Sequence, residues 1–146
     1  MRIQKLDEKH LKECSRMYVQ TFNREPWNDN WNEITSYKRL KDIYDTPGFL
    51  GLVVLDQDQL KAAVLGNIEQ WYKGDMYNLR EMFVNHEDKG SGIGSYLIVE
   101  LEKRIKELGV NSISLFTSRG DFTEKFYIKN GFITEEDMIM MYKNIW

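Results

Sequence analysis

The feature that most constrains this sequence is a strand-like run that leads through a glycine-rich turn into a long helical pattern. Residues 76–84 favour a strand, Gly90, Gly92 and Gly94 follow at alternate positions, and residues 92–108 carry one apolar stripe at helical spacing. Backbone N–H groups at a helix start have no intrahelical acceptor, and the helix dipole adds partial positive charge there. Since glycine has no Cβ to obstruct a ligand, the segment predicts an anion-binding loop suited to a pyrophosphate.

Two common pyrophosphate-binding motifs are excluded by the residues of this loop. A P-loop requires Lys followed by Ser or Thr after its last glycine, and the chain has Ile93-Gly94-Ser95 there instead. A dinucleotide fingerprint beginning at Gly90 requires Gly or Ala at position 95, where this chain has Ser95. The loop also follows antiparallel strand patterns, whereas a dinucleotide loop lies in a first strand–helix–strand unit.

Periodicity and turn residues predict the other elements. Helices are expected at residues 8–22, 32–44, 92–108 and 122–129, and strands at 2–6, 49–55, 60–68, 76–84 and 111–117. Residues 56–59 should form a hairpin turn and residues 69–74 a loop, and one or two closing strands are expected from Phe132 onward, where residues 138–142 are mostly apolar. This order predicts a single α+β domain spanning residues 1–146, with a mixed, mostly antiparallel sheet flanked by helices and one parallel strand pair.

Charge and composition narrow the partners. The chain has 20 basic and 23 acidic residues, well mixed, so nothing predicts nucleic-acid binding. Its one cysteine, Cys14, cannot form an internal disulfide, and the lone histidines His10 and His86 have no partners at metal-binding spacing, so no metal is expected. We find neither a signal peptide nor a membrane-length apolar run, which predicts a cytoplasmic protein with no membrane partner. The aromatic residues leave room for a homodimer face.

At three places the chain resembles the GNAT superfamily of N-acetyltransferases. The run Lys89-Gly90-Ser91-Gly92-Ile93-Gly94 resembles its acetyl-CoA motif, (Gln/Arg)-x-x-Gly-x-(Gly/Ala), with Lys89 as a cation in place of Gln or Arg. Residues 79–84 are similar to the fourth strand of the family, and residues 126–132 resemble its Phe-Tyr-x-x-x-Gly-Phe signature. The element order also matches along nearly the whole chain. The chain is therefore identified as a small, bacterial-type, single-domain member.

The resemblance implies where acetyl-CoA binds. The cofactor is expected in a gap between two splayed parallel strands, those ending at Val84 and Thr117, with its pantetheine arm paired to the backbone like an added strand. The pyrophosphate is expected on the glycine loop. The residues expected to contact the cofactor are Met82, Phe83, Val84, Lys89, Gly90, Ser91, Gly92, Ile93, Gly94, Ser95, Thr117 and Phe126.

The resemblance also implies two catalytic residues. In the family, a tyrosine at the position of Tyr127 protonates the departing thiolate of CoA, although a core aromatic residue would give the same pattern. Glu81 is the candidate base, acting directly or through water, because its strand passes the thioester and the acceptor amine must be neutral to attack. A strand carboxylate that forms a salt bridge is the other interpretation of Glu81. Cys14 lies far from every motif, so a covalent intermediate is not expected.

The acceptor is expected to contact the loop between the first two helices and the loop near Trp71. Tryptophans and carboxylates together suit a cationic amine, which favours a small-molecule acceptor. The candidate acceptor-binding residues are Glu25, Trp27, Trp31, Trp71 and Tyr72. For at least one of Trp27 and Trp31, packing of the loop onto the core is the favoured interpretation. Two further functions remain open: a CoA-binding sensor without catalysis, and a protein or peptide N-acetyltransferase.

Overall fold

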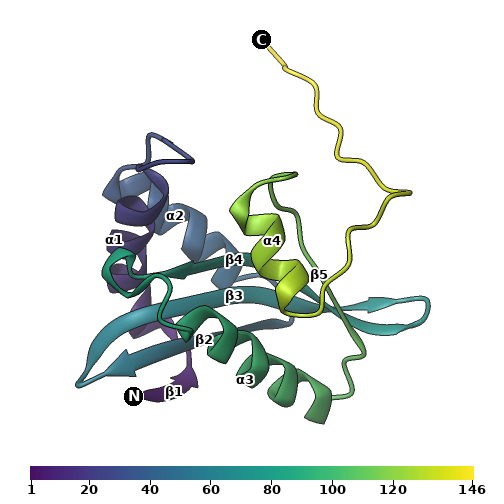
Figure 1. The fold of residues 1–146 in the computed structure, drawn as a ribbon, viewed down its shortest axis with the longest axis horizontal. Helices are drawn as coiled ribbons and strands as arrows, with labels where there is room; N and C mark the ends of the chain where they lie inside the picture. Colours follow the sequence, from purple (N-terminus) through teal and green to yellow (C-terminus); the bar gives the residue numbers. More distant parts are fainter. The chain divides into compact units, whose positions relative to one another are not determined.

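The computed structural model describes residues 1–146, which divide into two compact units, residues 1–116 and 117–146. The first unit contains a five-stranded sheet in the order β1-β2-β3-β4-β5 (Figure 1). Its strands are β1 (Arg2–Lys5), β2 (Phe49–Asp56), β3 (Gln59–Trp71), β4 (Gly74–Val84) and β5 (Ser112–Ser114). All neighbours are antiparallel except β4 and β5, which are parallel. The predicted α+β fold with a mixed, mostly antiparallel sheet is confirmed.

The first two helical segments begin at polar caps, as their sequences predict. A 3-10 turn (Glu8–His10) capped by Asp7 leads into α1 (Leu11–Phe22), and Asn32 caps α2 (Glu33–Tyr44) by accepting from the Thr35 N–H. A second 3-10 turn (His86–Asp88) precedes α3 (Ile93–Glu107). The predicted helices therefore form, and the first of them starts with a tighter turn.

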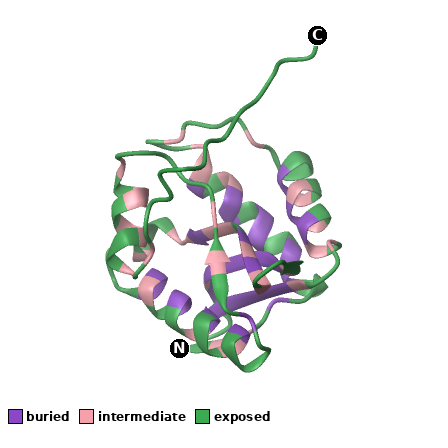
Figure 2. Ribbon diagram, turned by 90° about the vertical axis from the view of Figure 1, so that its right-hand side faces the viewer, coloured by how far each residue is buried: buried purple, intermediate pink, exposed green.

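Helices cover both faces of the sheet in the first unit. One core cluster joins α1 and α2 to one face, through side chains that include Tyr18, Leu40, Val53, Leu65 and Phe83. The alternate strand residues, including Val54 and Val64, are also buried, as are Leu97 and Leu101 of α3. Helix α3 covers this second face of the sheet (Figure 1), and the sheet between the helices is largely buried (Figure 2). This two-sided burial explains why β2 and β3 are nearly continuous apolar runs.

The two hairpins differ in how well the sequence predicts them. At the β2–β3 turn, Gln57 and Asp58 both have positive φ, 51° and 64°, which is the conformation that a two-residue hairpin requires. The segment predicted as a loop at residues 69–74 is instead mostly strand, because β3 continues to Trp71 and pairs with Gly74. Only residues 72 and 73 form the turn. The prediction failed there because a polar, aromatic run continues a strand when its partner strand is already in register.

The second unit is built around α4 (Phe122–Lys129), which Asp121 caps by accepting from the Phe122 N–H. The closing strands predicted from Phe132 onward are not formed, since residues 133–146 contain no strand and are exposed (Figure 2). The segment carries apolar side chains, among them Met140 and Tyr142, but its backbone pairs with no strand of the sheet. The last strand of the sheet is also shorter than predicted, because β5 has only three residues. No helix in the chain has the length and apolar character needed to cross a membrane.

Candidate active site

The parallel pair β4–β5 separates early, which leaves one edge of β4 open within the first unit. Pairing covers only Met76–Asn78 of β4 and Ser112–Ser114 of β5. On its other edge, β4 continues to pair with β3 as far as Val84. Residues 79–84 therefore present backbone groups on an edge that no other strand of the sheet covers. Such an edge can accept an extended ligand as an added strand.

A β-bulge in this open part of β4 determines where Glu81 points. Leu79 pairs with Gly66 and Glu81 pairs with Leu65, so Arg80 is an extra residue without a partner. Side chains alternate faces along a regular strand, and the bulge shifts this alternation by one. Leu79 thus lies on the α3 face, whereas Glu81 lies with Leu65 on the face that α1 and α2 cover. The sequence of β4 alone does not reveal the bulge, because it depends on the register in which β4 pairs with β3.

Glu81 is held by both helices on its face. The Tyr18 hydroxyl of α1 donates to Glu81 Oε2 at 2.6 Å, and Arg39 Nε of α2 donates to the same oxygen at 3.1 Å. The Glu81 side chain is 14% exposed, so this ion pair is largely shielded from water. Burial, followed by the charge of Glu81, raises the pKa of Tyr18 well above its usual range, so Tyr18 stays a donor at neutral pH. The ion pair with Arg39 fits the second interpretation of Glu81, a strand carboxylate in a salt bridge, and neither Tyr18 nor Arg39 was predicted as its partner.

The glycine loop has the conformation expected of an anion cradle. Gly90 and Gly92 have φ of 81° and 90°, and a Cβ on either glycine would meet no other heavy atom within 4 Å. Gly92 precedes α3 without a side-chain cap, and no acidic residue lies in the first turn of the helix. The N–H groups of Ile93, Gly94 and Ser95 precede the first helical hydrogen bond, which runs from Tyr96 to Gly92. These three N–H groups have no intrahelical acceptor and lie at the positive end of the α3 dipole.

The loop between α1 and α2 contacts the glycine loop through Trp27. Lys89 Nζ lies 4.8 Å from the centre of the Trp27 ring, in a cation–π contact. Burial, followed by the charge of Arg24, lowers the pKa of Lys89. The Trp27 ring in turn lies 5.0 Å from that of Phe22 on α1. A residue expected to bind the cofactor and one expected to bind the acceptor are therefore neighbours.

The same loop reaches Glu81 through aromatic packing. Asn23 holds the Trp31 backbone with two hydrogen bonds of 2.8 Å, and the Trp31 ring lies edge-on to Tyr18 at 5.0 Å. Tyr18 also contacts Phe22 and Phe83. Trp31 thus packs against the core, and through Tyr18 it shares a neighbour with Glu81. Glu25 of this loop is exposed.

Trp71 and Tyr72 lie apart from this cluster. They are at the β3–β4 turn and are 51% and 80% exposed. Glu81 lies seven positions after Gly74 on β4, a span of about 20 Å at the rise of an extended strand. The structure therefore brings Trp27 and Trp31 close to Glu81 and Lys89, and it does not bring Trp71 and Tyr72 there.

The remaining expected site residues belong to the second unit. Phe126 and Tyr127 lie on α4, and Thr117 is the first residue of the unit. The Tyr127 ring contacts Phe126 at 5.1 Å and Phe132 at 5.3 Å, and the Phe132 N–H donates to the Tyr127 carbonyl at 3.0 Å. Gly131, with φ of 92°, reverses the chain so that Phe132 folds back against the helix. The Phe-Tyr/Gly-Phe signature is thus one local packing unit.

A family model that matches most of the chain shows to which family the protein belongs. Residues 11–132 match the family model described as Acetyltransferase (GNAT) family. The chain belongs to the GNAT acetyltransferase family. It is accordingly an acetyl-CoA-dependent acetyltransferase, which agrees with the resemblance found in the glycine loop. No curated protein sequence matches this acetyltransferase.

Solved acetyltransferases share the fold of this GNAT chain at low sequence identity. An aminoglycoside 6'-N-acetyltransferase, AAC(6')-IG from Acinetobacter haemolyticus, has a TM-score of 0.78 at 18% identity, covering 99% of each chain. AAC(6')-Iy in complex with CoA has a TM-score of 0.77 at 15% identity, covering 99% of this chain and 95% of that one. The soil-metagenome enzyme meta-AAC0020 with sisomicin has a TM-score of 0.76 at 16% identity, covering 99% and 96%. These likenesses show the fold.

Two other features of this acetyltransferase lie outside the site. Cys14 is fully buried, and burial raises the pKa of its thiol to about 12, so it is protonated at neutral pH and is a poor nucleophile.

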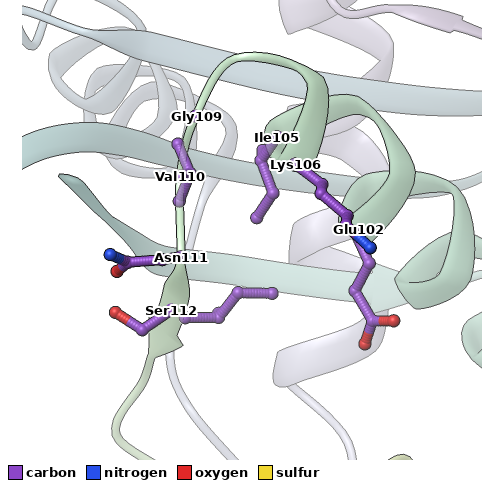
Figure 3. A pocket seen from close by; sticks show the side chains of 8 residues that line it. Glu102, Ile105, Lys106, Gly109, Val110, Asn111 and Ser112 are labelled. Carbon is purple, nitrogen blue, oxygen red and sulfur yellow. The ribbon is translucent and has the colours of Figure 1, made fainter. Parts of the chain in front are cut away.

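A pocket of about 490 Å³ lies between the end of α3 and β5, where Glu102, Ile105 and Lys106 form one wall (Figure 3). Since the glycine loop is at the other end of α3, about 20 Å away, this pocket is separate from the candidate site. No group of His, Cys, Asp and Glu side chains is placed to hold a metal.

Proposed function

We propose that this enzyme transfers the acetyl group of acetyl-CoA to a primary amine of a small molecule, by direct attack within a ternary complex. One observation carries the proposal: a continuous series of contacts links Lys89 of the glycine loop, Trp27 and Trp31 of the loop at residues 23–31, and Glu81 beside the open edge of β4. Residues proposed for cofactor, acceptor and base thus lie in one neighbourhood of the first unit.

In this proposal, acetyl-CoA lies along the open edge of β4 and ends at the glycine loop. The pantetheine arm pairs with the backbone of Met82 and Val84, and the pyrophosphate binds the N–H groups at residues 90–95 with Lys89 as counter-charge. The complex of CoA with a protein of the same fold supports this placement, as does the lack of acidic residues in the first turn of α3. Phe83, Thr117 and Phe126 remain predicted contacts of the cofactor.

The proposed reaction has one tetrahedral intermediate. The neutral amine nitrogen attacks the thioester carbonyl carbon, and a backbone N–H near Met82 stabilises the resulting oxyanion. The nitrogen gives its proton to Glu81, directly or through one water molecule. The carbon–sulfur bond then breaks, and the thiolate takes a proton from the Tyr127 hydroxyl to leave as free CoA. No acetyl-enzyme forms, which is consistent with the buried, protonated thiol of Cys14.

The acceptor proposed is a cationic small amine that binds against the loop at residues 23–31. Exposed Glu25 supplies negative charge, and the partly buried Trp27 and Trp31 supply aromatic surface. Two proteins of the same fold are aminoglycoside N-acetyltransferases, and a third was solved with sisomicin, which makes aminoglycosides the first class to test. Trp71 and Tyr72, about 20 Å along β4 from Glu81, would contact only an extended acceptor.

A thiol-release assay with acetyl-CoA tests the proposal. The acceptors are aminoglycosides, polyamines, amino acids and short peptides, and Tyr127→Phe is assayed beside the wild type. We expect release of CoA that depends on a small amine and is slower in the variant. Release with peptides alone would indicate a protein or peptide acetyltransferase. Tight acetyl-CoA binding without release on any amine would favour a CoA-binding sensor.

A further inference from the structure

The two groups that hold Glu81 contact the same oxygen atom. The Tyr18 hydroxyl and Arg39 Nε both donate to Oε2, at 2.6 Å and 3.1 Å, and Oε1 accepts no hydrogen bond from the chain. These donors come from the two helices packed on this face of β4, and they are the charged and titratable groups that bind the carboxylate. The carboxylate is therefore asymmetric, with one saturated oxygen and one oxygen left to accept a proton.

Neither partner can remove a proton from the acceptor amine in place of Glu81. The guanidinium of Arg39 has only donors and stays charged at any working pH. Burial and the neighbouring carboxylate raise the pKa of Tyr18, so its hydroxyl remains protonated and donates. Because an oxygen that accepts two donors is a poor site for a third proton, a proton taken up by Glu81 goes to Oε1.

We propose that Tyr18 and Arg39 are positioning residues for acetyl transfer, which hold Oε2 of Glu81 so that Oε1 alone accepts the proton of the acceptor amine. The inference rests on the proposed base role of Glu81 and goes beyond it, because it names the groups that orient the base. The fixed orientation matters because proton transfer requires the two heavy atoms to lie within hydrogen-bond distance. A carboxylate free to rotate would spend only part of its time in that geometry.

The position of the two donors links base orientation to the acceptor loop. Tyr18 lies on α1 and Arg39 on α2, so the loop at residues 23–31 connects the two helices that hold Glu81. Trp31 of that loop packs edge-on against Tyr18 at 5.0 Å. An acceptor bound on Trp31 would thus contact a residue that packs against Tyr18, which in turn donates to the base.

A double-mutant cycle on kcat tests this inference. Tyr18→Phe deletes one donor, Arg39→Met deletes the other while keeping most of the aliphatic stem, and Glu81→Gln is the reference variant. Glu81→Gln keeps both donors satisfied, because the amide oxygen replaces Oε2 and the NH₂ group replaces Oε1. We expect Tyr18→Phe and Arg39→Met each to lower kcat about ten- to a hundredfold with an unchanged KM for acetyl-CoA. In the Glu81→Gln background, we expect either change to alter kcat less than twofold.

Other outcomes separate the positioning role from the base role. A Tyr18→Phe or Arg39→Met enzyme that keeps wild-type kcat, while Glu81→Gln is inactive, would overturn the positioning role alone. Losses in kcat that multiply in the double variants would also overturn it, since purely structural effects are independent of the base. Wild-type kcat in Glu81→Gln would remove the base and the inference together. Circular dichroism and acetyl-CoA affinity establish that each variant is folded, and Arg39→Lys, which keeps a cationic donor, should recover part of the loss.

Discussion

The two compact units differ in how they are stabilised. Every buried residue lies at or before Val110, in the first unit, whereas the second unit, residues 117–146, has none. The first unit has a sheet covered by helices on both faces, and the second has one helix of eight residues with local aromatic contacts. The proposed catalytic groups are divided in the same way: Glu81 lies in a hydrogen-bonded network of the first unit, and Tyr127 lies on the helix of the second. The first unit therefore supplies rigid preorganisation, and the second contributes a donor whose role we expect to be smaller.

The largest expected loss of kcat follows substitution of Glu81, the residue held by Tyr18 and Arg39. Glu81→Gln should lower kcat by about 10²- to 10⁴-fold, because it removes the proton acceptor. The thermal unfolding midpoint should change little, since the amide oxygen still accepts from Tyr18 and Arg39. Steady-state kinetics with the best acceptor, beside thermal unfolding of both proteins, provides the measurement. A loss of less than about fivefold, well below the usual contribution of a general base, would show that another group or water takes the proton.

A pair of alanine substitutions compares the stability of the two units directly. Leu101→Ala, at a fully buried position of α3, should lower the free energy of unfolding by about 2–5 kcal/mol through a lost contact and a cavity. Met140→Ala, at a side chain that is 71% exposed, should change it by less than about 0.5 kcal/mol. Urea unfolding followed by tryptophan fluorescence measures both. A large loss for Met140→Ala would break the comparison, because it would mean that a surface covers the C-terminal segment in solution.

Alanine substitutions at two glycines, one at each end of α3, distinguish the effect of backbone strain on stability from the effect on acetyl-CoA binding. Gly92 and Gly109 have similar φ, 90° and 84°, and a Cβ on either would contact no other heavy atom within 4 Å. Both alanine variants should lose about 1–2 kcal/mol of stability, since alanine is strained at positive φ. Only Gly92→Ala should also weaken acetyl-CoA binding, by about tenfold, because it displaces the N–H groups of the cradle. Calorimetric titration with acetyl-CoA is the test, and equal affinities for the two variants would contradict the placement of the pyrophosphate.

The smallest effect is expected in the second unit. Tyr127→Phe should lower kcat by about tenfold or less, because a thiolate with an ordinary pKa near 8.5 leaves fairly well without a proton donor. The loss should shrink as pH falls, since protons from solvent then replace those of the phenol. Kinetics across pH 6–9 would show this trend. A loss as large as that of Glu81→Gln would reverse the comparison and make the second unit the main catalytic element.

The sequence predicted most of what is local and missed what depends on distant pairing. The helices and the glycine loop follow from patterns within about twenty residues, so their positions agree with the structure to within a few residues. The bulge at Arg80 depends on how β4 pairs with β3. The contacts of Glu81 with Tyr18 and Arg39 join positions 63 and 42 residues apart, and no local pattern marks them. The strands expected after Phe132 were wrong for the same reason. An apolar run such as residues 138–142 becomes a strand only where another strand offers its edge.

The most direct test of the account is a mass-spectrometric analysis of both products of the reaction. Acetyl-CoA is incubated with the enzyme alone and then with the best small amine, and the intact protein, the amine and free CoA are quantified. Direct attack predicts acetylated amine and free CoA in equal amounts, with no acetylated enzyme at any time. An acetylated enzyme that forms before the amine is added and then passes its acetyl group to the amine would contradict direct transfer aided by Glu81.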